Sequence, residues 1–308
     1  MKAPAGRVLV TGANGFVGSG IVAALIAAGR PVRAATRGPA DLPAGIEGAV
    51  IGDLRTPTNL SEALHGVDAV VHTAGLAHER NHDEAALRAV NAEATAKLAR
   101  AAKAAGVRVF VLLSSIRAQT GASADHTVTE ADPAAPTDAY GRSKLEAEEL
   151  LAGSGAPFVV FRPVLIHGPG MRFNMAALAE LAARRIPLPL AGFGAHRSIV
   201  ARRHLADAVL LALANPAMTG ETYIIADPEP LTVGHMIAAL RKGHGRRPGL
   251  FPLPGQAVAA AARLAGRAEE VERLRQPLVA DPGRLLAAGW KPRRSAFDAL
   301  VETGAGRD

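Results

Sequence analysis

Short apolar runs alternate with longer alanine-rich stretches through the first half of the chain. Such runs are typical of buried parallel strands, and the stretches between them have the composition of crossover helices. The predicted strands are residues 7–10, 32–35, 49–51, 69–72, 109–113 and 158–161, and the predicted helices are 18–28, 60–64, 84–105 and 138–151. This alternation predicts an α/β fold with an open, doubly wound parallel sheet.

The pattern changes after Gly170, where helices dominate and apolar runs no longer recur at regular intervals. We therefore expect a first domain over residues 1–170 and a smaller, mixed lobe over residues 171–308. Residues 193–200 and 221–226 still look like strands and could extend the main sheet. The two parts are accordingly expected to be interleaved.

Composition narrows the class of protein. The 308 residues are 49% hydrophobic and 20% charged, which excludes a disordered or low-complexity chain. With Cys 0 there is no disulfide framework and no cysteine-based zinc site, and we predict no metal site and a cytoplasmic protein. Residues 8–29 lack charge, but five glycines interrupt them, so we expect no membrane span.

The net charge of +7 is unevenly distributed. Residues 1–170 hold 16 Lys+Arg and 16 Asp+Glu, whereas residues 171–308 hold 19 and 12. A basic excess can indicate nucleic acid, an anionic membrane or a phosphorylated small molecule. Aromatic residues are only 4% and no nucleic-acid-binding motif is present, so we favour a small phosphorylated ligand over nucleic acid.

A glycine-rich loop follows the first predicted strand in the sequence VLVTGANGFVG. Gly12, Gly15 and Gly18 would allow a tight turn, close approach of a pyrophosphate, and close packing of the helix on the strand. The amides at the start of that helix would meet the negative charge. Three further loop residues are candidate cofactor contacts, namely Asn14, Phe16 and Val17.

The T-G-x-x-G-x-x-G spacing resembles the extended branch of the short-chain dehydrogenase/reductase superfamily, which includes nucleotide-sugar epimerases and dehydratases. The resemblance implies a Rossmann fold for the first domain and an NAD or NADP cofactor. It places Asp53 and Leu54 at the adenine and Pro163 and Val164 near the nicotinamide. It also places three residues of the HTAG sequence, Thr73, Ala74 and Gly75, along the middle of the cofactor. Arg37 ends the second strand where NAD enzymes carry an acid, which favours NADP over NAD.

Tyr140 and Lys144 stand four residues apart, which brings both side chains to one face of a helix. A neighbouring ammonium lowers the pKa of a phenol, as acid/base catalysis near neutral pH requires. Ser115 precedes the tyrosine by 25 residues, at the end of a strand. In similar enzymes a serine there orients the substrate oxygen, and Ser114 is the alternative. The resemblance implies that Asn91 supports the active-site helix and its lysine.

The second lobe matches the family less closely. The resemblance places Asn174 and Arg197 at the sugar diphosphate, and a guanidinium suits phosphate oxygens. His167 takes the place of an aromatic residue and is expected to be a packed core histidine, as Trp290 is expected to be a core anchor. His204 stands where relatives often have an acid, which leaves the substrate open.

Two reactions fit these residues. In the first, an epimerase oxidises and then reduces the 4-position of a nucleotide-diphosphate sugar; in the second, a reductase uses NADPH on a 4-keto sugar or another carbonyl compound. The pair Ile116 and Arg117 replaces the Asp-Glu pair of dehydratases, which argues against water elimination. A dinucleotide sensor without chemistry is disfavoured because Tyr140 and Lys144 are both present. The resemblance also implies a homodimer, joined through residues 84–105 and 138–151.

Overall fold

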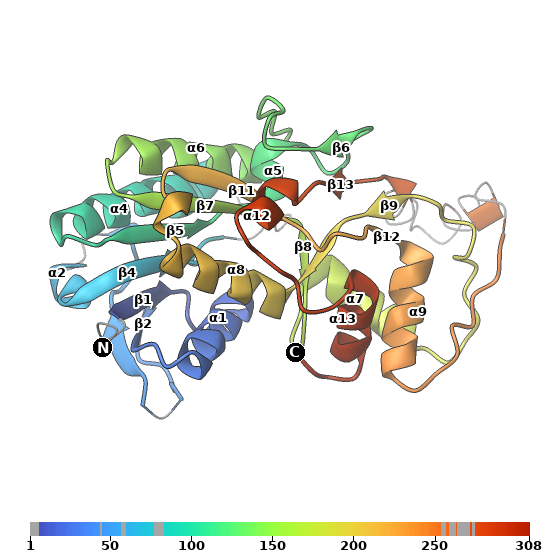
Figure 1. Cartoon of the computed structure of the whole chain (residues 1–308). Helices are drawn as coiled ribbons and strands as arrows, with labels where there is room; N and C mark the ends of the chain where they lie inside the picture. The colour runs from blue at the N-terminus through green and yellow to red at the C-terminus, as the bar shows by residue number, and fades with distance from the viewer. Residues whose placement is uncertain are drawn as a thin grey trace.

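The computed structural model describes residues 6–43, 45–56, 60–76, 83–253, 257–258, 263, 272 and 275–308. Seven parallel strands form its large sheet, in the order β11-β7-β5-β4-β1-β2-β3 (Figure 1). The strands are β1 (Arg7–Thr11), β2 (Val32–Thr36), β3 (Glu47–Val50), β4 (Val67–His72), β5 (Val109–Leu113), β7 (Phe158–Pro163) and β11 (Glu221–Ile225). The predicted doubly wound parallel sheet is confirmed.

The strand order reverses next to β1, because the chain first adds β2 and β3 on one side and then β4, β5 and β7 on the other. At such a switch point the loops leaving the carboxyl ends of two adjacent strands diverge and form a crevice, which is where ligands bind in open α/β sheets. The loops after β1 and β4 carry the glycine loop and Thr73, so the fold puts the predicted cofactor residues at this crevice.

Helices cover both faces of the sheet because side chains alternate along each strand. Val8 and Val10 belong to a core that also contains buried side chains of α1 (Phe16–Ala27) and α8 (Arg202–Ala214). Leu9, between them, belongs to the opposite core. That core is completed by α2 (Leu60–Leu64), α4 (Ala94–Ala104) and α6 (Ala139–Gly153).

The single helix predicted over residues 84–105 is interrupted. It begins as α3 (Glu84–Leu87), continues as the π-helical segment η1 (Arg88–Glu93), and ends as α4. A π segment accommodates an extra residue within one turn and often occurs at functional sites. Here it holds Asn91, one of the predicted site residues.

The second lobe has its own core, built on α7 (Phe173–Ala183), α9 (Val233–Gly243) and α13 (Ala296–Gly304). Figure 1 shows it beside the large sheet, with α9 on the far side of the molecule from that sheet. Its two-stranded pairs join β8 (Leu165–His167) to β10 (Ile199–Ala201), β9 (His196–Arg197) to β12 (Leu231–Thr232), and β13 (Val279–Ala280) to β6 (Thr127–Val128). The remaining short elements are α5 (Ile116–Gln119), η2 (Pro216–Met218) and α12 (Gly283–Ala287).

The two late segments expected to extend the sheet behave differently. Residues 221–225 form β11 at the sheet edge, whereas residues 193–200 supply β9 and β10, which pair outside the large sheet. The division of the chain at residue 170 stays a prediction. No helix among the described residues is long and apolar enough to cross a membrane.

Candidate active site

The glycine loop connects β1 to α1 with very little free space. A Cβ atom at Gly18 would lie 2.1 Å from the Gly12 carbonyl oxygen, and one at Gly12 would lie 2.8 Å from Thr73 Oγ1. Gly12 also has a φ of 66°, in the left-handed region that favours glycine. Gly15 is the N-cap of α1 and makes no side-chain cap, so the first turn presents backbone N–H groups at the crevice. Phe16 and Val17 begin α1, and Asn14 is exposed.

The loop after β4 is tied to β1 and to η1 through a buried histidine. Thr95 Oγ1 donates to the Asn91 carbonyl at 2.6 Å, so it accepts the hydrogen bond from His72 Nε2 at 3.0 Å. His72 Nδ1 then accepts from Thr11 Oγ1 at 2.6 Å. Burial, with a smaller effect of Lys144, lowers the pKa of His72 to about 3, so the imidazole is neutral.

Asn91 holds the loop that follows Thr73 and Ala74. Its Oδ1 accepts from the Leu76 amide at 2.8 Å, and its Nδ2 donates to Ser143 Oγ in α6 at 3.0 Å. A Cβ atom at Gly75 would lie 2.8 Å from Asn91 Oδ1 and 3.8 Å from Lys144 Nζ. The structure therefore brings Asn91, Gly75 and Lys144 together.

Ser115 and Tyr140 meet at the carboxyl end of β5. Ser115 is the N-cap of α5, where its Oγ accepts from the Arg117 amide at 3.1 Å. That leaves the hydroxyl hydrogen free, and a side-chain hydrogen bond from Ser115 lowers the pKa of Tyr140. Burial has the larger, opposite effect, so the pKa of Tyr140 is raised overall.

Lys144 lies at the carboxyl end of β5. Its Nζ donates to the Leu113 carbonyl at 2.8 Å. Burial lowers the pKa of Lys144 to about 8, against an opposing effect of Glu148. The effect of its ammonium on the pKa of Tyr140 stays a prediction.

Ser114, the alternative serine, belongs to a buried polar cluster instead. Its Oγ donates to Glu148 Oε1, and Arg162 Nε donates to the same carboxylate at 3.1 Å. Arg162 Nη1 also donates to Gln119 Oε1. Sequence reasoning missed this cluster. Its signal is that Glu148 follows Lys144 by four residues, on the helical face that also carries Tyr140.

Arg117 is the charged side chain that flanks Tyr140. It forms an ion pair with Asp138, whose Oδ1 caps α6 by accepting from the Gly141 amide at 2.7 Å. Arg117 lowers the pKa of Tyr140 and Asp138 raises it. Arg117 also lowers the pKa of Arg197, after the larger effect of burial, so the two guanidinium groups lie close enough to repel each other.

The remaining predicted residues lie on several elements. Arg197 donates to the carbonyls of Gln276 at 2.6 Å and Ala122 at 3.2 Å, and Asn174 is exposed on the first turn of α7. Pro163 ends β7, and the Val164 amide donates to the Ile225 carbonyl at 3.2 Å. Leu54 is half-buried and packs against the core that contains α2, α4 and α6.

At the adenosine end, Arg37 is exposed directly after β2, and no carboxylate ends that strand. Asp53 pairs with Arg55 at 2.5 Å, and this partner, with a minor effect of Arg37, lowers the pKa of Asp53 to about 2.

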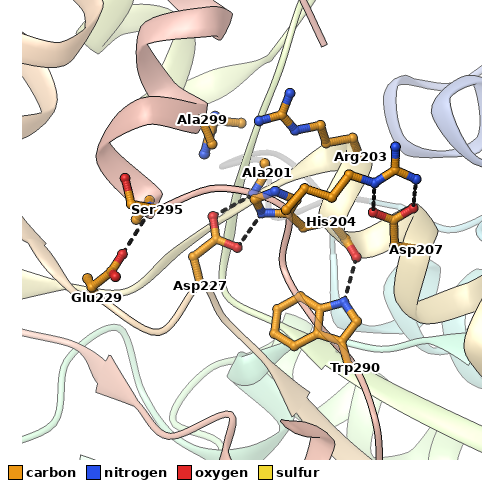
Figure 2. Close-up of polar contacts among 12 residues, drawn as sticks. Ala201, Arg203, His204, Asp207, Asp227, Glu229, Trp290, Ser295 and Ala299 are labelled. Atoms are coloured by element: carbon orange, nitrogen blue, oxygen red, sulfur yellow. Dashed lines mark hydrogen bonds and ion pairs between the residues drawn. The ribbon is translucent and has the colours of Figure 1, made fainter.

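His204, at a position where relatives often have an acid, pairs with the carboxylate of Asp227. Its Nδ1 lies 2.7 Å from Asp227 Oδ1, and its carbonyl accepts from Trp290 Nε1 at 3.0 Å (Figure 2). Asp227 Oδ2 also accepts from the Ala201 amide. Both His204 and Asp227 are fully buried, so the pair connects the loop after β11 to the start of α8. Trp290 packs in the core, 2% exposed.

His167 is also fully buried, and its Nδ1 donates to Thr303 Oγ1 at 2.9 Å because Thr303 uses its own hydrogen on the Ala299 carbonyl. Burial lowers the pKa of His167 to about 3.

Comparison with known proteins shows the family of the chain. The profile of the NAD dependent epimerase/dehydratase family matches residues 8–226. The chain belongs to this family. The chain is similar to the UDP-glucose 4-epimerase of Vibrio cholerae, with 29% identity over 96% of this chain and 94% of that protein. It is also similar to sterol demethylase protein B of Methylococcus capsulatus, with 33% identity over 77% and 75% of the two chains.

Among solved structures, MoeE5 in complex with UDP-glucose and NAD superposes with a TM-score of 0.77, at 25% identity and 97% coverage of both chains. The chain is therefore an NAD-dependent enzyme of the extended short-chain dehydrogenase/reductase type. MoeE5 holds NAD, so this likeness does not support the preference for NADP drawn from Arg37.

Proposed function

We propose that this enzyme epimerises a nucleotide-diphosphate sugar at its 4-position, with Tyr140 as the acid/base. The observation that carries the proposal is the hydrogen-bonded pair of Ser115 and Tyr140 at the carboxyl end of β5. The pair lies beside the switch point of the sheet, where the glycine loop begins. The similarity to a UDP-glucose 4-epimerase over nearly the whole chain supports the choice of substrate.

Each side chain of the site has a separate role in the proposed reaction. A dinucleotide bound through the glycine loop would accept hydride from the sugar carbon and return it. Tyr140 Oη takes the hydroxyl proton when the 4-position is oxidised and gives a proton to the 4-keto oxygen when it is reduced. Ser115 Oγ accepts from the Arg117 amide through one lone pair, and its single hydroxyl hydrogen turns from Tyr140 to the same oxygen when the substrate binds. Arg117 supplies positive charge that favours the phenolate.

Lys144 and Asn91 would act from beneath the cofactor. Lys144 Nζ has further hydrogens beyond the one given to Leu113, and these are available to a ribose hydroxyl. Asn91 fixes the loop at Gly75 and, through Ser143, the helix that carries Tyr140 and Lys144. For the sugar diphosphate we propose Arg197 and Asn174 as contacts.

One observation favours the reductase as a second candidate. The raised pKa of Tyr140 keeps its phenol protonated at neutral pH, and a protonated phenol is the form that donates to a carbonyl oxygen during reduction. In that case the same residues act in one direction only, and the reduced cofactor is consumed.

Cofactor choice depends on Arg37. Its guanidinium is exposed directly after β2, and we propose that it binds a 2′-phosphate, so Arg37→Ala is expected to weaken NADPH binding at least tenfold and NADH binding much less. Fluorescence titration of both cofactors tests this. An equal loss of affinity for NADH and for NADPH would contradict the role given to Arg37.

The proposed reaction is tested by incubating the purified protein with UDP-glucose and with UDP-glucuronate, with and without added NADPH, and separating the products by chromatography. Interconversion of 4-epimers without net use of cofactor is expected. Consumption of NADPH by a keto sugar would support the reductase instead. Bound dinucleotide with no turnover of any carbonyl or sugar substrate would overturn both proposals and indicate a sensor.

A further inference from the structure

A basic pocket lies in the second lobe, where α7 and α9 end. It encloses about 550 Å³. Its lining combines five arginines and a histidine with three other residues, namely Arg184, Arg185, Ile186, Pro187, Arg241, His244, Arg246, Arg247 and Gly249. Figure 1 shows α9 on the far side of the molecule, whereas α5 and α6, which begin next to Ser115 and Tyr140, border the large sheet. The pocket is therefore separate from the proposed active site.

Two loops are fixed side by side to form the pocket. Leu188 pairs with Leu250, the Leu188 amide donates to the Gly249 carbonyl at 3.0 Å, and the Phe251 amide donates to the Leu188 carbonyl at 3.1 Å. These backbone hydrogen bonds hold the two loops side by side, so the residues that precede them lie on neighbouring segments of backbone. Arg184 and Arg185 precede the pairing on one loop, and Arg246 and Arg247 precede it on the other.

Arg241 forms the floor between these loops and is 3% exposed. Its Nη1 donates to the Pro248 carbonyl at 2.6 Å and its Nη2 donates to the Ile186 carbonyl at 2.8 Å. Its Nε donates to the Ala182 carbonyl at 3.2 Å. The buried guanidinium thus joins the end of α7 to both loops that line the pocket. These hydrogen bonds hold the backbone of the pocket in place without a ligand.

The charges of this pocket are not paired with acidic side chains among the described residues. Within the described parts of the chain, no Asp or Glu forms an ion pair with any of its five arginines. Arg246 donates to the Ala183 carbonyl at 2.5 Å, and burial together with Arg246 lowers the pKa of Arg241. Arg184, Arg185 and Arg247 are exposed, and their side chains make no hydrogen bond to the described residues. Like charges held this close repel, and an anion between them would relieve that repulsion.

We propose that this pocket binds a phosphate group through the exposed guanidinium groups of Arg184, Arg185 and Arg247. A planar guanidinium can give two parallel hydrogen bonds to phosphate oxygens, and the volume suits a small ligand. The phosphate has two possible sources. One is a soluble phosphate ester, and the other is a phospholipid headgroup, since Ile186 in the pocket wall is 53% exposed and Phe251 beside it is 40% exposed.

The test uses the full chain with its dinucleotide site saturated by NADH, so that the glycine loop does not capture the probe. Inorganic pyrophosphate is titrated by calorimetry, and co-sedimentation is measured with vesicles of phosphatidylcholine alone or mixed with phosphatidylglycerol, all at near-physiological salt. The pocket variant is Arg184→Gln with Arg247→Gln. The matched control is Lys291→Gln with Arg307→Gln, which removes the same charge from exposed positions elsewhere.

The wild type and the control are expected to bind pyrophosphate or the phosphatidylglycerol vesicles, with at least tenfold weaker binding by the pocket variant at an unchanged melting temperature. Binding to pyrophosphate identifies a soluble ligand, and binding to vesicles alone identifies a lipid headgroup. The proposal is overturned if the wild type binds neither probe, or if the control loses as much affinity as the pocket variant.

Discussion

Tyr140 is subject to opposing influences from its neighbours. Burial and Asp138 raise the pKa of its phenol, while the Ser115 hydrogen bond and Arg117 lower it. A group that must both take and give a proton works best when its pKa is near the working pH. The neighbours of the tyrosine therefore set the pKa of its phenol, and Arg117 is a neighbour that can be altered without touching the reacting atoms.

Replacing Arg117 by Met is expected to raise the pKa of Tyr140, because it removes a cation that favours the phenolate and takes away the ion pair of Asp138, which itself raises that pKa. A base is active when deprotonated, so the rising limb of kcat/KM against pH for sugar oxidation should move to higher pH. The pH profile of the variant measures this shift directly.

Arg142→Met is the control for that change. Arg142 lies on the same helix but pairs with Glu84 at 2.9 Å, and it does not contribute to the shift of the Tyr140 pKa. Its profile should match that of the wild type. A shift toward lower pH in Arg117→Met, or the same shift in both variants, would contradict the role given to Arg117.

At the scale of elements, a single buried histidine connects three of them. His72 ends β4, bonds Thr11 at the end of β1, and bonds Thr95 in α4, which in turn bonds the Asn91 carbonyl in η1. The π turn and both loops of the cofactor crevice thus depend on an imidazole that stays neutral.

That dependence makes the protein sensitive to acid. The pKa of His72 is about 3 when folded and near 6.5 when unfolded, so the unfolded chain binds the proton first as pH falls. The stabilisation that the neutral His72 imidazole gives the folded protein is complete above pH 6.5 and is lost as pH falls toward 3. His72→Gln should reduce the loss in unfolding free energy between pH 7 and pH 5 by about 2 kcal/mol, as measured by urea unfolding at both pH values.

His126→Gln provides a control of opposite sign. His126 is exposed beside Asp125, which raises the pKa of the imidazole, so its contribution is present at low pH and lost as pH rises. Removing this imidazole should make the loss in unfolding free energy between pH 7 and pH 5 larger. An unchanged pH dependence in His72→Gln would show that the imidazole is not held neutral.

The strands, the sheet and the glycine loop could be predicted from the sequence because each leaves a local signal. Val8, Leu9 and Val10 are apolar in succession since both faces of β1 are covered. The π turn could not be predicted, because its cause is a set of bonds from Asn91 to residues 15 and 52 positions away. The position of the Lys144 ammonium could not be predicted either, because it donates to the Leu113 carbonyl, 31 residues away in the sequence.

At the scale of the whole molecule, arginines from residues 171–308 lie in two separate places among the described residues. Arg197 lies near Arg117 and the active site, whereas four exposed or half-buried arginines gather where α7 and α9 end. The sequence led us to assign the excess positive charge to binding of a sugar diphosphate. It could not show a second cluster, because it does not tell that residues 184 and 246 lie close together. The fold brings those two segments together.

The outer face of α4 and α6 is the surface on which the expected dimer would form. Leu145 of α6 is half-buried and lies outside the hydrophobic cores of the described residues. We expect sedimentation to give twice the mass of the chain for the wild type and a monomer for Leu145→Glu. Val50→Glu, at a side chain 63% exposed on β3, should remain a dimer. A monomeric wild type, or equal effects of the two variants, would contradict this interface.

In the proposed reaction, hydride leaves and returns at one carbon of a nucleotide sugar. It is tested most directly with UDP-glucose and UDP-glucuronate that carry deuterium at C4, followed by NMR of the products. We expect 4-epimers that retain the deuterium at C4 for the wild type, and no turnover by Tyr140→Phe. Epimers that have exchanged C4 hydrogen with solvent, or an active Tyr140→Phe, would contradict it.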